Sequence, residues 1–252
     1  MKISRICVLP AALLLIFGAG APLCAQDTEA ETSVSRTAPR GVGFHVAADL
    51  VSSYIWRGMY QTTASLQPTL SLSAGNFSLT AWGSTTFTDN GAKEIDLTAA
   101  YRVGRFTIAV ADLWWGGQGS KTGYFNYESR ETEHHFEGTL ACSVSDRFPL
   151  SIAWNTLFAG QDKNAEGEQA YSTYVELNYP FAVKGIDLNA ACGFTPWDAP
   201  QYGTSEFAVT NLALKAGKTI RITKSFSLPL FTQVILNPAK NDVYFVAGIT
   251  LR

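Results

Sequence analysis

Several residue types that carry chemistry are scarce in this sequence. Its 252 residues include 4 cysteines, 3 histidines and 2 methionines, and only 16% are charged. So few cysteines exclude a small disulfide-rich scaffold, and the cysteines and histidines lack the close spacing of a metal site. The formal net charge is −2 and no run of basic residues occurs, which argues against a nucleic-acid partner. We expect no cofactor, no bound metal and no nucleic acid.

One long apolar run is present, at the N-terminus. Residues 1–25 combine Lys2 and Arg5 with the stretch ICVLPAALLLIFGAGAPLC and end on the small residue Ala25. This pattern is typical of a secretory signal peptide, and we predict cleavage after Ala25. Loss of two basic residues and no acidic residue would change the net charge from −2 to −4. Such a leader predicts export from the cytoplasm.

The chain after this leader has no apolar run long enough for a membrane helix, which needs roughly 18 residues. Residues 26–42 are polar, lack periodicity and predict a flexible periplasmic segment. Two cysteines remain, Cys142 and Cys192, on separate predicted strands, and the sequence leaves open whether they pair. Aromatic residues make up 12% of the chain. High aromatic content with little charge predicts a protein whose outer surface does not face water.

Alternation of apolar and polar residues begins at Gly43 and continues to the C-terminus, less cleanly in the last three runs. The run FAVTNLALKA changes phase near Thr210, which predicts a bulge there. In ASLQPTLSLSAGNFSLTAWGSTTF, the apolar residues have even numbers up to Ala74 and mainly odd numbers from Phe77. Alternation with a period of two predicts strands with one apolar face, because successive side chains point to opposite sides of a sheet. The change of phase across Gly75 predicts a hairpin whose two strands keep their apolar faces on the same side.

Twelve such runs occur, joined alternately by tight turns and by longer polar loops. This arrangement predicts an all-β fold, a transmembrane antiparallel up-and-down β-barrel of about 12 strands over residues 43–252. A soluble β-sandwich shows the same alternation, with its apolar faces buried between two sheets. The difference between turns and loops favours the barrel, as do polar faces built mostly from small Ser, Thr, Ala and Asn residues.

Aromatic residues gather at the predicted strand ends. Two aromatic belts separated by aliphatic residues are typical of the two interfaces between a membrane and water. Trp82 is out of phase with its strand, so an inward-pointing side chain is the alternative for this residue. The belt at the loop end is predicted to contain Tyr54, Trp56, Trp82, Trp114, Trp115, Phe158 and Tyr171.

Charged residues on the polar strand faces are the candidates for lining the barrel interior. An excess of acidic groups would slightly favour cations or neutral polar solutes. Alternatively, these charges pair across strands and fill the interior, because unpaired buried charges are costly. Arg57 could line a constriction or pair with Asp49 or Glu137. The predicted lumen-lining residues are Asp49, Arg57, Glu94, Asp96, Arg102, His135, Glu137, Glu176 and Asp187.

The segments SSYIWRG and LQPTLSLSAGNFSLTAWGS, together with the ending NPAKNDVYFVAGITLR, resemble the TorF-like family of proposed outer-membrane porins. Many of its members are conserved bacterial proteins of uncharacterised role. The resemblance spans residues 44–252. It implies a barrel in the outer membrane of a Gram-negative bacterium, surrounded by lipid, with a pore role. The chain ends on Leu251 and Arg252, whereas barrels usually end on an aromatic residue that the barrel-assembly machinery reads.

Three functions follow from this interpretation. The leading one is a porin, and not an enzyme, through which small hydrophilic solutes diffuse passively. The second is a closed barrel with a structural or binding role, in which loops 116–134 and 197–206 contact ligands. The third is a lipid-acting enzyme that uses His134 on the outer face. We expect no serine beside His134, and a nucleophile must contact its base, so catalysis is the weakest hypothesis.

Overall fold

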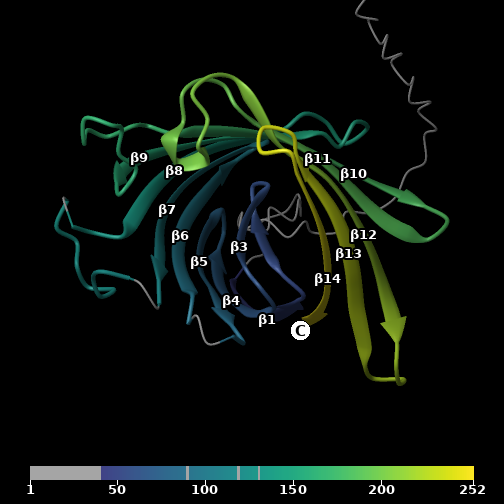
Figure 1. Cartoon of the computed structure of the whole chain (residues 1–252). Coiled ribbons are helices and arrows are strands. Elements are labelled where there is room, and N and C mark those ends of the chain that lie inside the picture. Colours follow the sequence, from purple (N-terminus) through teal and green to yellow (C-terminus); the bar gives the residue numbers. More distant parts are fainter. Residues whose placement is uncertain (1–40, 89–90, 118–119, 130) are drawn as a thin grey trace, which may run out of the picture.

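A computed structural model describes residues 41–88, 91–117, 120–129 and 131–252. The predicted signal peptide, residues 1–25, lies outside the described residues, as does the predicted leader up to residue 40. Within the described part, no helix is long and apolar enough to span a membrane. The chain consists mainly of strands, which form one large ring (Figure 1).

Twelve strands close into an antiparallel barrel, in which each strand pairs with its neighbours in the chain. This confirms the predicted all-β, antiparallel up-and-down barrel and the predicted number of strands. The wall strands are β1 (Val42–Val51), β4 (Ser65–Ala74), β5 (Phe77–Thr86), β6 (Lys93–Val103), β7 (Phe106–Gly116), β8 (His134–Ser143), β9 (Ser151–Gly160), β10 (Thr173–Val183), β11 (Ile186–Thr195), β12 (Ala208–Arg221), β13 (Ser227–Asn237) and β14 (Asp242–Leu251).

The hairpin of β4 and β5 explains the change of phase in the sequence. Leu72 pairs with Leu79, and Leu70 pairs with Ala81, so even positions on β4 face odd positions on β5. Residues that pair directly across two strands point to the same side of the sheet. The apolar side chains of both strands therefore share the outer face. Between them, Ser71 and Thr80 meet on the inner face, where their hydroxyl groups hydrogen-bond at 2.9 Å.

The short connections after β4, β6, β8, β10 and β12 define the turn end of the barrel, and the opposite end is its loop end. Two bulges interrupt the ladders of the barrel wall. One leaves Thr210 without a partner between the pairs Gly193–Asn211 and Phe194–Val209, where the sequence predicted it. The other leaves Phe158 unpaired on β9. A bulge re-aims the side chains around it, and both of these lie toward the loop end.

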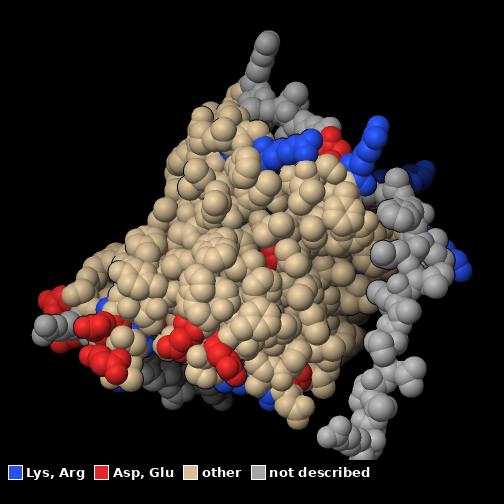
Figure 2. All heavy atoms as spheres, turned by 90° about the horizontal axis from the view of Figure 1, so that it is seen from above, with Lys and Arg blue, Asp and Glu red and all other residues tan. Residues whose placement is uncertain are grey.

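The ring closes between β1 and β14. This seam contains four residue pairs, from Ala48–Leu251 to Val51–Gly248, whereas β1 pairs with β4 along its whole length. Cys142 on β8 and Cys192 on β11 are both free, so no disulfide joins them. In Figure 2, charged side chains lie mainly along the borders of a broad uncharged face.

The segment between β1 and β4 does not extend outward as a loop. It forms a small separate hairpin, β2 (Tyr54–Trp56) and β3 (Met59–Thr62), whose strands pair only with each other. Figure 1 shows this hairpin inside the ring of wall strands. A short 3-10 helix, η1 (Pro200–Tyr202), interrupts the loop between β11 and β12. These two elements shape the interior.

Candidate functional site

The β2–β3 hairpin spans the interior of the barrel from wall to wall. On one side, Ile55 packs with Ala213 and Phe231 of the β12 and β13 wall. On the other side, Trp56 packs in a cluster that includes Leu157 of β9. Burial of such apolar groups is the main favourable contribution to the packing of the hairpin. The loop end of the lumen is therefore filled by the protein itself.

Four of the seven predicted belt residues lie inside the barrel, and their assignment to an outer belt is wrong. Tyr54 and Trp56 are 5% and 4% exposed within the hairpin cluster, and Trp82 and Trp115 pack against that cluster from the wall. The alternation that places Tyr54 and Trp56 outside ends with β1 at Val51. The chain then leaves the wall. The rule of strand parity, by which alternate residues of a wall strand face opposite sides, therefore no longer applies to the hairpin.

The remaining belt candidates are on the outside. Phe158 and Tyr171 are exposed, at 44% and 55%. Trp114 also points outward, opposite Ile95, but the ring of Tyr124 from the β7–β8 loop packs edge-on against it at 5.4 Å. Trp114 is consequently buried on the outer face.

The turn of the hairpin is docked tightly on the wall. Arg57 and Gly58 both have positive φ, at 50° and 81°, as a two-residue hairpin turn of the primed type requires. A Cβ on Gly58 would stand 1.9 Å from the carbonyl oxygen of Thr210, at the bulge of β12. Asn237 of β13 donates a hydrogen bond to the carbonyl oxygen of Gly58 at 3.0 Å. Glycine is the residue that allows this approach.

Arg57 forms the central ion pair of the lumen. Its guanidinium donates two hydrogen bonds to Glu137 of β8, at 2.6 and 2.9 Å, and a third to the hydroxyl oxygen of Tyr202 at 2.6 Å. The rings of Trp56 and Tyr174 each lie 4.7 Å from the guanidinium carbon. The sequence offered Asp49 and Glu137 as acidic partners of Arg57. The bidentate pair is formed with Glu137. Bidentate geometry suits the planar guanidinium, and the aromatic faces add attraction.

Tyr202 brings a second loop into the lumen. Its ring stacks on Trp56 and on Tyr174, with centroid distances of 5.5 Å in both cases. Burial raises the pKa of the Tyr202 hydroxyl, so this group stays neutral beside Arg57 at physiological pH. Sequence reasoning missed Tyr202 because it assigned residues 197–206 to an outer ligand-contacting loop.

A second buried acid, Glu176 of β10, is satisfied by neutral donors. The hydroxyl of Tyr174 and the amide of Asn178 both donate to its carboxylate, and the amide of Asn211 does so at 3.2 Å. The same amide donates to the hydroxyl of Tyr174 at 3.1 Å. Hydrogen bonds of this kind offset the cost of burying a carboxylate. This network joins β10 to β12 and has a structural role.

The other candidate lumen residues also point inward, as their strand positions require. Glu94 and Asp96 are buried, and Tyr54 donates a hydrogen bond to Glu94 at 3.3 Å. His135 is buried with its ring 4.4 Å from that of Trp115. Three further candidates lie on the inner positions of their strands and are only partly buried, namely Asp49, Arg102 and Asp187.

His134 lies on the outer face under the β7–β8 loop. Its Nδ1 is 2.6 Å from an Asp112 carboxylate oxygen and its Nε2 is 2.6 Å from the carbonyl oxygen of Tyr124. The ring of Tyr127 stacks on it at 4.2 Å. Both nitrogens thus face acceptors, and the side chain is fully buried. This geometry gives His134 no free nitrogen with which to activate a nucleophile.

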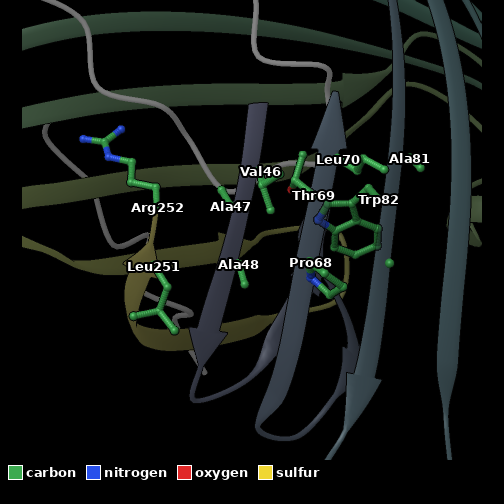
Figure 3. A pocket seen from close by; sticks show the side chains of 11 residues that line it. Val46, Ala47, Ala48, Pro68, Thr69, Leu70, Ala81, Trp82, Leu251 and Arg252 are labelled. Carbon is green, nitrogen blue, oxygen red and sulfur yellow. The ribbon is translucent and has the colours of Figure 1, made fainter. Parts of the chain in front are cut away.

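An apolar depression lies beside the seam, as Figure 3 shows. Its volume is about 670 Å³, and apart from Thr69 and Arg252 its lining is apolar or lacks a side chain. Small residues such as Ala48, Ala81 and Gly83 leave this space open. The depression has no set of polar groups that would select a hydrophilic solute, in contrast to the lumen.

Among the described residues, no three or more His, Cys, Asp or Glu side chains gather in a way that could hold a metal ion. No protein-family model matches this sequence, and no curated protein matches it. The resemblance to TorF-like porins therefore stays a prediction that rests on the quoted segments.

Proposed function

We propose that this chain is an outer-membrane β-barrel, exported through a cleaved signal peptide. In this proposal small hydrophilic solutes diffuse along a path that the β2–β3 hairpin narrows. The observation that carries the membrane part is the inverted distribution of side chains. In a water-soluble protein, large apolar side chains are mostly buried and charged ones exposed. On much of the wall the opposite is found: large apolar side chains are exposed and polar or charged ones are buried.

The two sets are clear from their exposure. Large apolar side chains that are exposed on the wall strands include Phe44, Val46, Leu70, Leu72, Leu79, Tyr101, Ile108, Leu140, Leu214 and Phe245. Polar or charged side chains that are buried on the same strands include Gln67, Glu94, Asp96, Glu137, Asn155, Glu176, Asn189, Lys215 and Gln233. Hydrocarbon around the barrel accounts for the first set, and a polar interior accounts for the second.

Barrel size supports a narrow passage. About eight strands are filled by their own side chains and roughly sixteen leave a water channel, so twelve lie between. Toward the turn end, the inner positions carry small side chains such as Ser71, Thr80, Thr98 and Thr107, which are only partly buried. Toward the loop end, Arg57 with its partners occupies the interior. Passage would be limited at this level.

A closed barrel is the second candidate, because the hairpin contacts opposite walls through buried apolar and ionic groups. Planar-bilayer recordings separate the two functions. The protein is refolded into detergent and compared with a variant in which residues 53–63 are replaced by a short Gly-Ser linker. A porin gives steady conductance in both, larger in the variant. A closed barrel is silent until the hairpin is removed.

Four further measurements test the membrane proposal itself. A barrel that faces hydrocarbon needs detergent to stay dispersed, and its folded form migrates differently on gels before and after boiling. Cell fractionation should recover it with outer-membrane lipid, and depletion of the barrel-assembly machinery should reduce its amount there. A product that stays monodisperse in plain buffer would contradict the membrane proposal. Silent bilayers for both the full chain and the linker variant would contradict the pore.

A further inference from the structure

Two buried carboxyl groups near the loop end form no ion pair with a basic side chain of the described residues. Glu94 and Asp96 point inward from β6 and are 4% and 3% exposed. Their carboxyl groups lie in hydrogen-bonding contact with each other. The guanidinium of Arg57 is directed to Glu137 instead, and within the described chain neither member of the pair forms an ion pair. Two adjacent carboxylates in such a place are costly without a compensating positive charge.

Two oxygen atoms at this position also lack hydrogen-bond partners among the described residues. One is Oδ1 of Asp96, and the other is the hydroxyl oxygen of Ser84, whose residue is 5% exposed. Ser84 lies directly opposite Glu94 on β5, and both are inner positions. Buried polar atoms almost always have a partner. A single proton shared by the two carboxyl groups would leave both of these oxygens unsatisfied.

We propose that Glu94, Asp96 and Ser84 bind one hard divalent cation of the calcium type. Calcium prefers oxygen ligands in flexible geometry, and two carboxylates balance its charge. The hydroxyl of Tyr54, which already contacts Glu94, is a further oxygen at the site. One cation would satisfy the carboxylates and the unpartnered hydroxyl at once. Two carboxylates are fewer acidic ligands than a site that encloses the metal ion completely would use.

The surroundings shield the site from bulk water. Trp82 pairs across the strands with Asp96, and Trp115 pairs with Glu94, so an indole lies on each side. Trp82 also contacts the ring of Tyr54 at 5.5 Å. The two indoles and the burial of the three polar side chains keep bulk water away from the site. The same indoles are two fluorescent side chains beside the bound ion.

Equilibrium dialysis against radioactive calcium tests this inference without relying on conductance. The full chain is refolded from inclusion bodies into detergent, so that no lipopolysaccharide contributes calcium sites. The wild-type protein should retain one ion per chain. Asp96→Asn should lower the affinity at least tenfold, and Ser84→Ala should lower it several-fold. Asp198→Asn, a matched change on an exposed loop, should leave it unchanged, and the boiled-versus-unboiled gel shift checks that each variant is folded.

Three outcomes would overturn the assignment. The wild-type protein retains no calcium, or Asp96→Asn retains as much as the wild type, or the stability of the fold responds to pH but to neither calcium nor magnesium. The last result would mean that the pair binds protons alone. Calcium binding that survives Ser84→Ala unchanged would contradict the hydroxyl as a ligand. Tryptophan fluorescence should change saturably with calcium in the wild type and not in Asp96→Asn.

Discussion

Arg57 and Glu137 lie 80 positions apart in the sequence and meet inside the barrel through two hydrogen bonds of 2.6 and 2.9 Å. Their side chains are 4% and 6% exposed. This pair fixes the hairpin turn to β8, while Gly58 fixes the same turn to β12 through its contact with Thr210. The hairpin is thereby attached to the ring at two places, with three wall strands between them.

Glu137→Gln should lower the free energy of unfolding by about 3–5 kcal/mol, because it removes the carboxylate of a buried bidentate ion pair. Urea unfolding in detergent, followed by tryptophan fluorescence, measures this change. The double variant Arg57→Met/Glu137→Gln removes both charges and should recover part of the loss. If the double variant is as unstable as the sum of both single variants, the pair is not coupled and the assignment is wrong.

Gly58→Ala should displace the hairpin, because a Cβ at this position would stand 1.9 Å from a backbone oxygen that cannot move away easily. Gly75→Ala is the matched control: Gly75 also has positive φ, at 59°, but its Cβ would meet nothing within 4 Å. We expect the control to cost about 1 kcal/mol of backbone strain and the test variant clearly more. Equal costs in urea unfolding would argue against a docked turn.

Trp56→Ala should lower the free energy of unfolding by about 3–5 kcal/mol, as expected when a large buried aromatic side chain is removed. Phe158→Ala removes an aromatic group of the outer face and should cost much less in detergent, which covers that face in any case. A bilayer recording of the same two variants should show altered conductance only for Trp56→Ala. Similar effects of both changes would contradict the different positions of the two rings.

Glu133 should make the β7–β8 loop sensitive to acid. Burial alone would raise the pKa of Glu133, but hydrogen bonds from the Ser120 hydroxyl, the Lys121 backbone N–H and Thr122 lower it below its usual value. A lowered pKa stabilises the fold above the unfolded value of about 4.3, and this contribution is lost as the pH falls through the folded value.

Hydrogen exchange of the Lys121 amide measures this effect, since that amide donates to Glu133 at 2.8 Å. Protection should be full near neutral pH and should fall below about pH 4, after correction for the intrinsic exchange rate. Glu133→Gln should show weak protection that no longer depends on pH. Unchanged protection of the wild-type amide down to about pH 2 would be inconsistent with this account.

The wall of the barrel could be predicted from the sequence, because every wall strand obeys one rule. Apolar and polar residues alternate, and a hairpin keeps the apolar sets of both strands on one face, as Leu72 and Leu79 illustrate. Even the bulge at Thr210 left a signal, a local change of phase. Strand parity also placed Glu94, Asp96, Glu137 and Glu176 inside.

The interior could not be predicted in the same way, because contacts such as Trp56 with Tyr202 join residues that no local pattern relates. One signal was nevertheless present. Arg57 and Gly58 separate two short runs of strand-forming residues, YIW and MYQT, and a residue followed by glycine in such a place is typical of a tight hairpin. Four of the seven aromatic residues assigned to the outer belt pack around this hairpin instead, namely Tyr54, Trp56, Trp82 and Trp115.

Ring closure depends on the last residues of the chain, Gly248–Leu251, which pair with Val51–Ala48 immediately before the hairpin begins. The first and last wall strands are thus neighbours, although almost the whole sequence separates them. Strand β14 must therefore be synthesised before the circle can be sealed. Loss of the four terminal wall residues would leave an open sheet with its inner hairpin unenclosed.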